Sequence, residues 1–420
     1  MWFRIALRSD DNMSLTARLE DGFFMAVAII LALQIIVVAS SAFSTRFRRR
    51  RASVTLGHLR LPEIAIGQSR VQVYTYGVTL YQSMLADIRA ANDSICIESF
   101  IWKGDTIGSE IKEAILLKAQ DGVQVYAIFD DFSNLVVPRE FKKFPSPINL
   151  LRYRAWLRLW DVFDPRNLAR DHRKLLVIDG KIGYSGGYNI GDLYGAKWRD
   201  THVRIEGDAA RNLYSSFVDF WNEHVDGQRQ LPKPSASLLP HMRLYANDPK
   251  RLMFPIRSMY IEAIDLAKER VLLTTPYFIP DRHVLSSLIL AARRGVDVRL
   301  MVPEESNHLL ADWLARTYFT ECLRQGIRIF LYQAAMIHAK TATIDGAWTT
   351  VGTANLDRLS LVGNYELNIE FVHPAMAQQM EQVFSDDLQH CRELRLDEWL
   401  RRPLAQKLGE LVLSPLWPFL

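Results

Sequence analysis

Two copies of one pattern of potentially reactive side chains occur in the chain. In each copy a histidine is followed by a lysine and then by an aspartate at the same spacing: His172, Lys174 and Asp179 in the first, and His338, Lys340 and Asp345 in the second. A single histidine beside a lysine is weak evidence for a site. Two matching half-sites instead predict one active site to which both copies contribute.

An asparagine and an acid recur at equal distances from each histidine. Asn189 and Asn355 lie 17 residues downstream (189 − 172 and 355 − 338), and Asp200 and Glu366 lie 28 residues downstream (200 − 172 and 366 − 338). A carboxylate that accepts the Nδ1 proton of a histidine fixes its tautomer and leaves Nε2 free to attack. We therefore expect the two acids to orient the two histidines.

The residue types of the two half-sites indicate phosphoryl chemistry. Lys174, Lys340, Asn189 and Asn355 together would form a cationic, donor-rich cradle for the oxygens of a phosphodiester in its transition state. A metal site is disfavoured, because a lysine stands where the cation would bind and the carboxylate clusters that hard metals prefer are absent from the motif. With two histidines, one would attack phosphorus and the other would serve as acid and base, with no cofactor.

The aspartate of each pattern has a simpler interpretation. Asp179 and Asp345 belong to the candidate catalytic set by position, but a glycine follows each of them between two extended segments. Asp-Gly in that setting is a hairpin signal. We therefore favour a structural turn, or a buried partner for a cation, over direct catalysis.

The surrounding sequence predicts two similar α/β units. A strand at 94–102, a helix at 107–120 and a strand at 123–129 are followed later by a strand at 271–275, a helix at 281–294 and a strand at 296–302. The two histidines are 166 residues apart (338 − 172), so the pattern indicates an internal duplication. Each His-x-Lys lies on a strand-like run, where alternate side chains share a face.

These patterns divide the chain into segments. We expect an N-terminal segment at 1–22, a transmembrane helix at 23–43, a basic linker at 44–64, a first lobe at 65–227, a Pro-rich and Ser-rich linker at 228–247, a second lobe at 248–400 and an apolar C-terminal tail at 401–420. We expect the tail to pack on the second lobe; contact with the membrane interface is the alternative.

The predicted anchor is the 21-residue run at 23–43, which matches the thickness of a bilayer core. A secretory signal is the alternative, but it needs its positive charge before the apolar run. Here five arginines at 46–51 follow it. The positive-inside rule then predicts cytoplasmic lobes beside an anionic membrane surface.

Composition sets broad limits. The 420 residues suffice for two lobes, and the net charge of +4 decides little. Three cysteines without a CxxC spacing disfavour a disulfide framework or a zinc site and favour a reducing compartment.

The duplicated pattern with its downstream asparagine resembles the phospholipase D superfamily, and the flanking sequence is most similar to the bacterial cardiolipin synthases. The flanking segments are 98–102, 171–174, 198–207, 275–280 and 352–357, and the resemblance covers about residues 65–420. It implies two α/β lobes whose sheets meet across a shared site. It also implies that His172 is the nucleophile and His338 the acid and base.

The implied reaction joins two phosphatidylglycerol molecules into cardiolipin, with phosphatidylethanolamine as another possible substrate and no nucleic acid partner. The implied location is the bacterial inner membrane, although many such synthases have two N-terminal spans where this sequence predicts one. A hydrolase that yields phosphatidic acid, a membrane-tethered nuclease and a non-catalytic scaffold are the alternatives. The sequence does not indicate the oligomeric state.

One residue departs from the family pattern. Many relatives carry Asn where this chain has Asp171, directly before the first histidine. Its carboxylate could tune the pKa of His172, but we favour a side chain that faces solvent.

Overall fold

The computed structural model describes residues 59–135, 137–154, 164–235 and 237–413. The predicted N-terminal segment and transmembrane helix, and most of the basic linker, therefore lie outside the described residues. Within the described ranges, none of the helices combines the length and the apolar character that crossing a bilayer requires.

The first half of the molecule is built on an eight-stranded mixed sheet. Its strands, in spatial order, are β1 (Ile64–Ile66), β2 (Ser69–Tyr74), β9 (His202–Gly207), β7 (Ile182–Gly186), β6 (Lys174–Ile178), β3 (Ser94–Ser99), β4 (Gln124–Asp130) and β5 (Asn149–Tyr153). Its helices are α2 (Gly77–Ala90), α3 (Thr106–Gln120), α4 (Asp192–Lys197) and α5 (Asp208–His224), with 3₁₀ turns at Pro165–Leu168 and Gly227–Arg229.

The second half has a sheet of the same size. Its strands, in spatial order, are β10 (Met242–Asn247), β19 (Glu366–Val372), β17 (Trp348–Gly352), β16 (Thr341–Ile344), β11 (Arg270–Thr274), β13 (Asp297–Pro303), β14 (Arg328–Tyr332) and β20 (Cys391–Leu394). Its helices are α6 (Pro255–Leu266), α7 (Arg282–Arg293), α8 (Leu309–Arg324), α9 (Arg358–Val362), α10 (Pro374–Leu388), α11 (Leu396–Leu400) and α12 (Leu404–Leu413).

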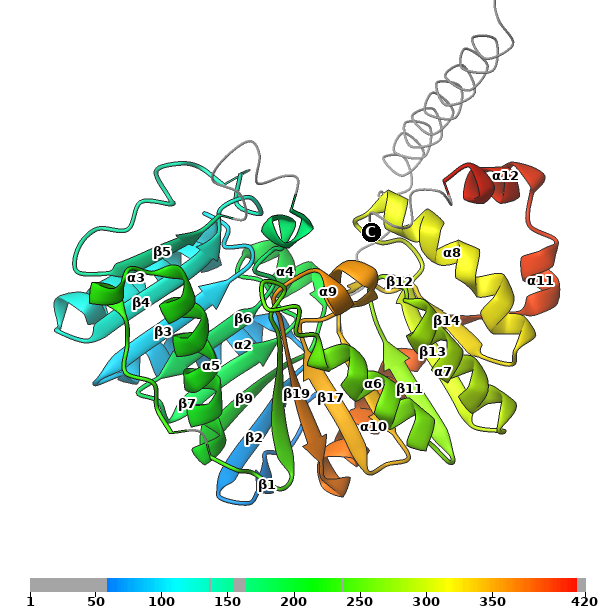
Figure 1. Cartoon of the computed structure of the whole chain (residues 1–420), viewed down its shortest axis with the longest axis horizontal. Helices are drawn as coiled ribbons and strands as arrows, with labels where there is room; N and C mark the ends of the chain where they lie inside the picture. The colour runs from blue at the N-terminus through cyan, green and yellow to red at the C-terminus, as the bar shows by residue number, and fades with distance from the viewer. Residues whose placement is uncertain (1–58, 136, 155–163, 236, 414–420) are drawn as a thin grey trace, which may run out of the picture.

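The two sheets follow one topology. The seven strands from β2 to β5 in the first sheet correspond, in the same spatial order, to those from β10 to β14 in the second. Among the described strands of these two sheets, only the edge strands β1 and β20 lack a counterpart. The predicted α/β duplication is therefore confirmed at the level of strand order, and Figure 1 shows the two sheets side by side with helices packed on them.

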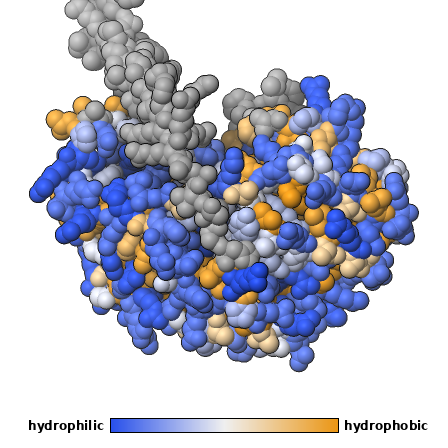
Figure 2. All heavy atoms as spheres, turned by 180° about the vertical axis from the view of Figure 1, so that it is seen from behind, coloured by the Kyte–Doolittle hydropathy of each residue, from blue (hydrophilic) through white to orange (hydrophobic). Residues whose placement is uncertain are grey.

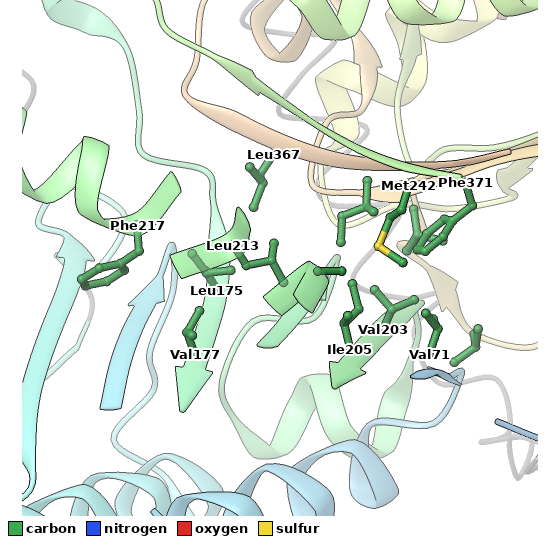
Figure 3. Packing of buried hydrophobic residues seen from close by; sticks show 14 of the residues in the cluster. Val71, Leu175, Val177, Val203, Ile205, Leu213, Phe217, Met242, Leu367 and Phe371 are labelled. Carbon is green, nitrogen blue, oxygen red and sulfur yellow. The ribbon is translucent and has the colours of Figure 1, made fainter. Parts of the chain in front are cut away.

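One hydrophobic cluster joins the halves. It contains Val71, Val203 and Ile205 from the first sheet together with Leu367 and Phe371 from the second. Figure 3 shows the side chains of the second sheet directed toward those of the first. Because this shared core excludes water between the sheets, the halves form one packed body rather than two domains on a flexible linker.

The structure changes the expected bounds of the central linker. Residues Met242–Asn247, which we placed in the linker at 228–247, form β10 and pair with β19. Their apolar members explain this, because Met242 is buried in the shared core and Leu244 packs against it. At the other end of the chain, α12 packs on α8, with Leu413 buried against Leu314.

Candidate active site

Each histidine and lysine lies where a central strand begins. Lys174 is the first residue of β6, and His338 and Lys340 come just before β16. We predicted that each His-x-Lys run lies within a strand. In the structure β6 begins only at Lys174, and β16 begins one residue after Lys340. The neighbouring strand β3 ends at this same edge, because Ser99 pairs with Lys174 across the antiparallel ladder.

Two short parallel pairings carry residues of one half to the histidine of the other. Ile337 pairs with Arg199, and the backbone N–H of His338 donates to the carbonyl oxygen of Arg199 at 2.6 Å. In the same way Asp171 pairs with Tyr365, and the N–H of His172 donates to the carbonyl oxygen of Tyr365 at 3.0 Å. The pairings are equivalent under the duplication, so the halves are related by an approximate twofold axis.

The candidate orienting acids, Asp200 and Glu366, directly follow Arg199 and Tyr365 in the chain. Each acid contacts the histidine of the opposite half, so the acids are exchanged between the halves. Both carboxylate oxygens of Glu366 lie 2.9 Å from Nδ1 of His172. Oδ2 of Asp200 lies 2.6 Å from Nδ1 of His338. The contacts that the predicted orientation requires are present, and each joins one half to the other. Equal spacing within each half gave no indication of this exchange.

The two lysines lie close to each other and to both acids. Nζ of Lys174 donates to the carbonyl oxygen of His172 at 2.7 Å, and Lys340 donates likewise to His338. Burial lowers the pKa of Lys174 to about 8, although neighbouring carboxylates oppose the shift. Burial and the charge of Lys174 lower the pKa of Lys340 to about 7 against the effect of Asp200. Both ammonium groups are therefore more acidic than in water, mainly because burial removes the water that stabilises their charges.

The same burial favours the neutral form of both imidazoles. His172 and His338 are only 8% and 5% exposed. Burial and the two lysines lower the pKa of each histidine well below its usual value. With Nδ1 held by a carboxylate, a neutral ring presents Nε2 as a nucleophile or a base.

The asparagines lie in the loops that follow β7 and β17, and both are buried. The hydroxyl of Tyr81 donates to the carbonyl oxygen of Asn189. The side-chain amide of Asn355 donates to Asp357 at 2.9 Å. The side-chain oxygens of both asparagines are buried without a hydrogen bond to any described residue.

Thr353 also belongs to the site, although no motif in the sequence predicted it. Its hydroxyl donates to Glu366. The equivalent residue of the first half is Gly187, where a Cβ would lie 2.0 Å from Oδ1 of Asp200. The longer acid thus has a hydroxyl partner and the shorter one lies against a glycine. The sequence does contain a signal for this difference, because the residue two positions before the asparagine is glycine in the first half and threonine in the second.

Both motif aspartates lie at the opposite ends of their strands. Asp179 has a φ of 53° and accepts hydrogen bonds from the backbone N–H groups of Asn92, Asp93 and Ser94. Asp345 has a φ of 50° and binds the N–H groups of residues 268–270 in the same way. The predicted hairpins are confirmed, since β6 pairs with β7 and β16 with β17.

These backbone contacts also account for the acidity of the two aspartates. Partial burial acts to raise the pKa of each, but the donated N–H groups outweigh it and lower the pKa. In the structure, neither aspartate stands with the histidines, lysines and exchanged acids, and their place in the candidate catalytic set has no geometric support.

The expectation that Asp171 faces solvent is wrong, because this residue is 0% exposed. The reason is the chain crossing, which pairs Asp171 with Tyr365 and draws it between the halves. Its carboxylate lies beside that of Glu98, and burial and that neighbour raise the pKa of Asp171 well above its usual value.

Three comparisons with known proteins show what the chain resembles. Residues 260–388 match the family model described as "Cardiolipin synthase, PLD-like domain". The chain is 33% identical to the major cardiolipin synthase of Bacillus subtilis, over 83% of this chain and 75% of that protein. It is 31% identical to cardiolipin synthase A of Pseudomonas putida, over 86% of this chain and 77% of that protein.

A solved structure shares the fold. The phosphatidylserine synthase of Haemophilus influenzae superposes with a TM-score of 0.62 at 16% identity, over 86% of this chain and 94% of that one. At this identity the likeness concerns the fold alone. The sequence relatives carry the family assignment: the chain belongs to the cardiolipin synthases of the phospholipase D superfamily.

Proposed function

We propose that the protein is a cardiolipin synthase that transfers a phosphatidyl group from one phosphatidylglycerol to another and releases glycerol. The observation that carries the proposal is the exchange of acids, by which two neutral histidines are each held at Nδ1 by the opposite half. The named relatives supply the reaction class, since their printed names are those of cardiolipin synthases.

The reaction divides between the two histidines. His338 takes up a proton at Nε2 when the anionic phosphodiester binds beside it. Nε2 of His172 then attacks phosphorus and forms a phosphatidyl-histidine, while His338 gives that proton to the departing glycerol oxygen. His338 then removes the proton of a hydroxyl on the second phosphatidylglycerol, whose oxygen displaces His172 from phosphorus. The choice of His172 as the nucleophile rests on the family resemblance, since the geometry of the two histidines is nearly symmetric.

The remaining side chains would stabilise charge. Lys174 and Lys340 stand beside the histidines and would bind the non-bridging oxygens, with Asn189 and Asn355 as further donors. Glu366 would hold the positive charge that develops on His172 as its Nε2 bonds to phosphorus, and Asp200 would hold the imidazolium of His338. No cofactor enters this scheme.

The setting we propose is the inner face of a bacterial cell membrane. A single helix at 23–43 would anchor the chain, with the N-terminal segment outside and both lobes in the cytoplasm. The proposed segment bounds are those predicted above, except that the second lobe begins with β10.

The test is product analysis with the full-length protein and phosphatidylglycerol as the sole lipid. We expect cardiolipin and glycerol, and we expect His172→Ala and His338→Ala each to abolish both products. His241→Ala, at an exposed histidine before β10, serves as the matched control. Phosphatidic acid as the main product would replace the proposal with a hydrolase, and cleavage of nucleic acid with retained phosphatidylglycerol would replace it with a nuclease.

A further inference from the structure

Two exposed leucines occupy equivalent positions in the two halves. Leu193 in α4 and Leu359 in α9 are 43% and 41% exposed. They are 166 residues apart (359 − 193), which is the spacing of the two histidines. Each follows the asparagine of its half by four positions. A large apolar side chain is thus exposed at the same place in both halves.

Both leucines lie on helices that adjoin the active site. In α4, the ring of Tyr194 packs 4.9 Å from that of Trp198, which in turn packs 4.9 Å from the ring of His338. In α9, the first turn is capped by Asp357, which also accepts the amide of Asn355. Because an approximate twofold axis relates the halves, the leucines stand on either side of the site. In the view of Figure 1, both α4 and α9 lie near the middle of the molecule.

A third exposed apolar side chain lies beside the segment that leads into His172. Phe132 is 47% exposed and follows the end of β4 by two residues. The guanidinium of Arg170, two residues before His172, lies 3.8 Å from the centre of its ring. We refer to Phe132, Leu193 and Leu359 as the apolar rim.

Positive charges accompany the apolar rim. Arg170 covers Phe132, Arg358 directly precedes Leu359, and the exposed Lys197 ends α4. An exposed leucine by itself needs no explanation, and Figure 2 shows small apolar groups scattered over a largely hydrophilic face. The rim differs because its leucines are duplicated and adjoin both half-sites. Asp192, directly before Leu193, is the one acid beside these leucines in the sequence, and it accepts hydrogen bonds from the first turn of α3.

Apolar side chains interspersed with cations fit the surface of an anionic bilayer, where the side chains enter the acyl boundary and the cations meet lipid phosphates. Under the function proposed above, which this inference assumes, the substrate phosphodiester lies at that level. We propose that the apolar rim inserts into an anionic bilayer, so that the phosphodiester reaches the histidines while the acyl chains stay in the membrane.

The first experiment separates membrane docking from catalysis. The full-length double variant Leu193→Ser/Leu359→Ser is compared with wild type on phosphatidylglycerol vesicles and on a short-chain phosphatidylglycerol dissolved as monomers. We expect a loss of about tenfold per leucine on vesicles, because each substitution removes most of one apolar contact with lipid. On the monomeric substrate the rate should change less than twofold.

The matched control is Leu266→Ser. Leu266 is 69% exposed and ends α6, beside the backbone segment bound by Asp345 at the edge opposite the histidines. It should retain the wild-type rate on both substrates. Equal losses of the double variant on both substrates, or no loss on vesicles, would overturn the proposal.

The second experiment reads insertion without turnover. Cysteines replace Leu193, Leu359 or Leu266 in a Cys391→Ser background, because Cys96 and Cys322 are buried. Each is labelled with an environment-sensitive fluorophore and mixed with vesicles of phosphatidylglycerol that carry a quencher in the acyl region. We expect quenching at 193 and 359 and none at 266. Equal signals at all three positions would overturn the proposal.

Failure of the proposed function is distinguishable from failure of this inference. If wild type produces no cardiolipin while the labels at 193 and 359 are quenched, the function falls and the docking surface stands. If cardiolipin forms but the labels stay unquenched, docking falls alone. A double variant that only dissociates a self-assembled form of the protein would identify the rim as an interface between copies and overturn the inference.

Discussion

The two half-sites match, but the buried residues that adjoin them differ between the halves. We call these adjoining residues the layer below each half-site. The three equivalent pairs of positions are Glu98 and Thr274, Asp171 and Ile337, and Arg173 and Ala339. In the first half this layer is a buried cluster of charges. In the second half it is largely apolar.

In the first half, Nε of Arg173 lies 3.1 Å from Glu98, and its guanidinium also donates to the carbonyl oxygen of Ser216 at 3.0 Å. Burial raises the pKa of Glu98 and that of Asp171, so the two adjacent carboxyls favour holding a proton. In the second half, Ile337 and Ala339 belong to a hydrophobic cluster with Met301. The duplication has therefore kept the histidine, lysine and asparagine of each half-site and left the layer below free to diverge.

The largest expected effect tests the symmetry of the half-sites. We expect Asp200→Asn and Glu366→Gln each to lower kcat by about 10²- to 10⁴-fold, because an amide no longer holds the required tautomer of its histidine. The measurement is kcat and KM for cardiolipin formation, and KM should change little. If only one substitution has this effect, the halves do not use their exchanged acids alike.

The next effect tests the asymmetry of the layer below. Arg173→Met leaves buried carboxyls without their cation, and we expect it to destabilise the protein by about 3–5 kcal/mol. Ile337→Asp, which introduces a carboxylate without a cation, should cost a similar amount. Thermal unfolding of the full-length protein measures both, with Ala339→Ser as a mild control. Unchanged melting of Arg173→Met would show that the charges do not support the fold.

A smaller effect should be equal in the two halves. Asp179→Ala and Asp345→Ala each remove a carboxylate that binds three backbone N–H groups, and we expect a loss of about 1–2 kcal/mol with normal activity per folded molecule. The pKa of each aspartate is lowered in the fold, so this stability is present above the unfolded pKa and disappears as pH falls through the folded pKa. Loss of kcat without loss of stability would restore them as catalytic residues.

The smallest effect concerns Asp171→Asn. Asparagine has the shape of the protonated acid and can donate to Glu98, so activity should stay within about twofold. The raised pKa of Asp171 makes its stability contribution fully present below the unfolded pKa and lost as pH rises through the folded pKa. The variant should therefore melt higher than wild type at pH 8, by the equivalent of about 1 kcal/mol, and match it at pH 4. Equal melting at both pH values would show that the pair carries no excess proton.

Local signals predicted the repeated elements and the turns well. The Asp-Gly hairpins and the α/β order follow from nearest neighbours in the chain, which is why Asp179 and Asp345 were interpreted as turn residues. The strand β10 was missed, because Met242 and Leu244 follow a Pro-rich segment and pair only with the distant β19.

Contacts between the halves could not be predicted from such local sequence patterns. Equal spacing placed Asp200 and Glu366 near histidines, but the choice of partner depends on the parallel pairings of Arg199 and Tyr365 with the opposite half. Asp171 was misjudged for the same reason, since only the crossing chain buries it.

The exchanged acids also show an advantage of having both copies in one chain instead of in two identical subunits. Two identical subunits related by a twofold axis would have to present the same carboxylate to both histidines. A fused chain has no such constraint, and here one histidine faces an aspartate beside a glycine while the other faces a glutamate beside a threonine. Because the two halves are covalently linked, each half-site can change one residue at a time while its histidine keeps a carboxylate partner from the other half.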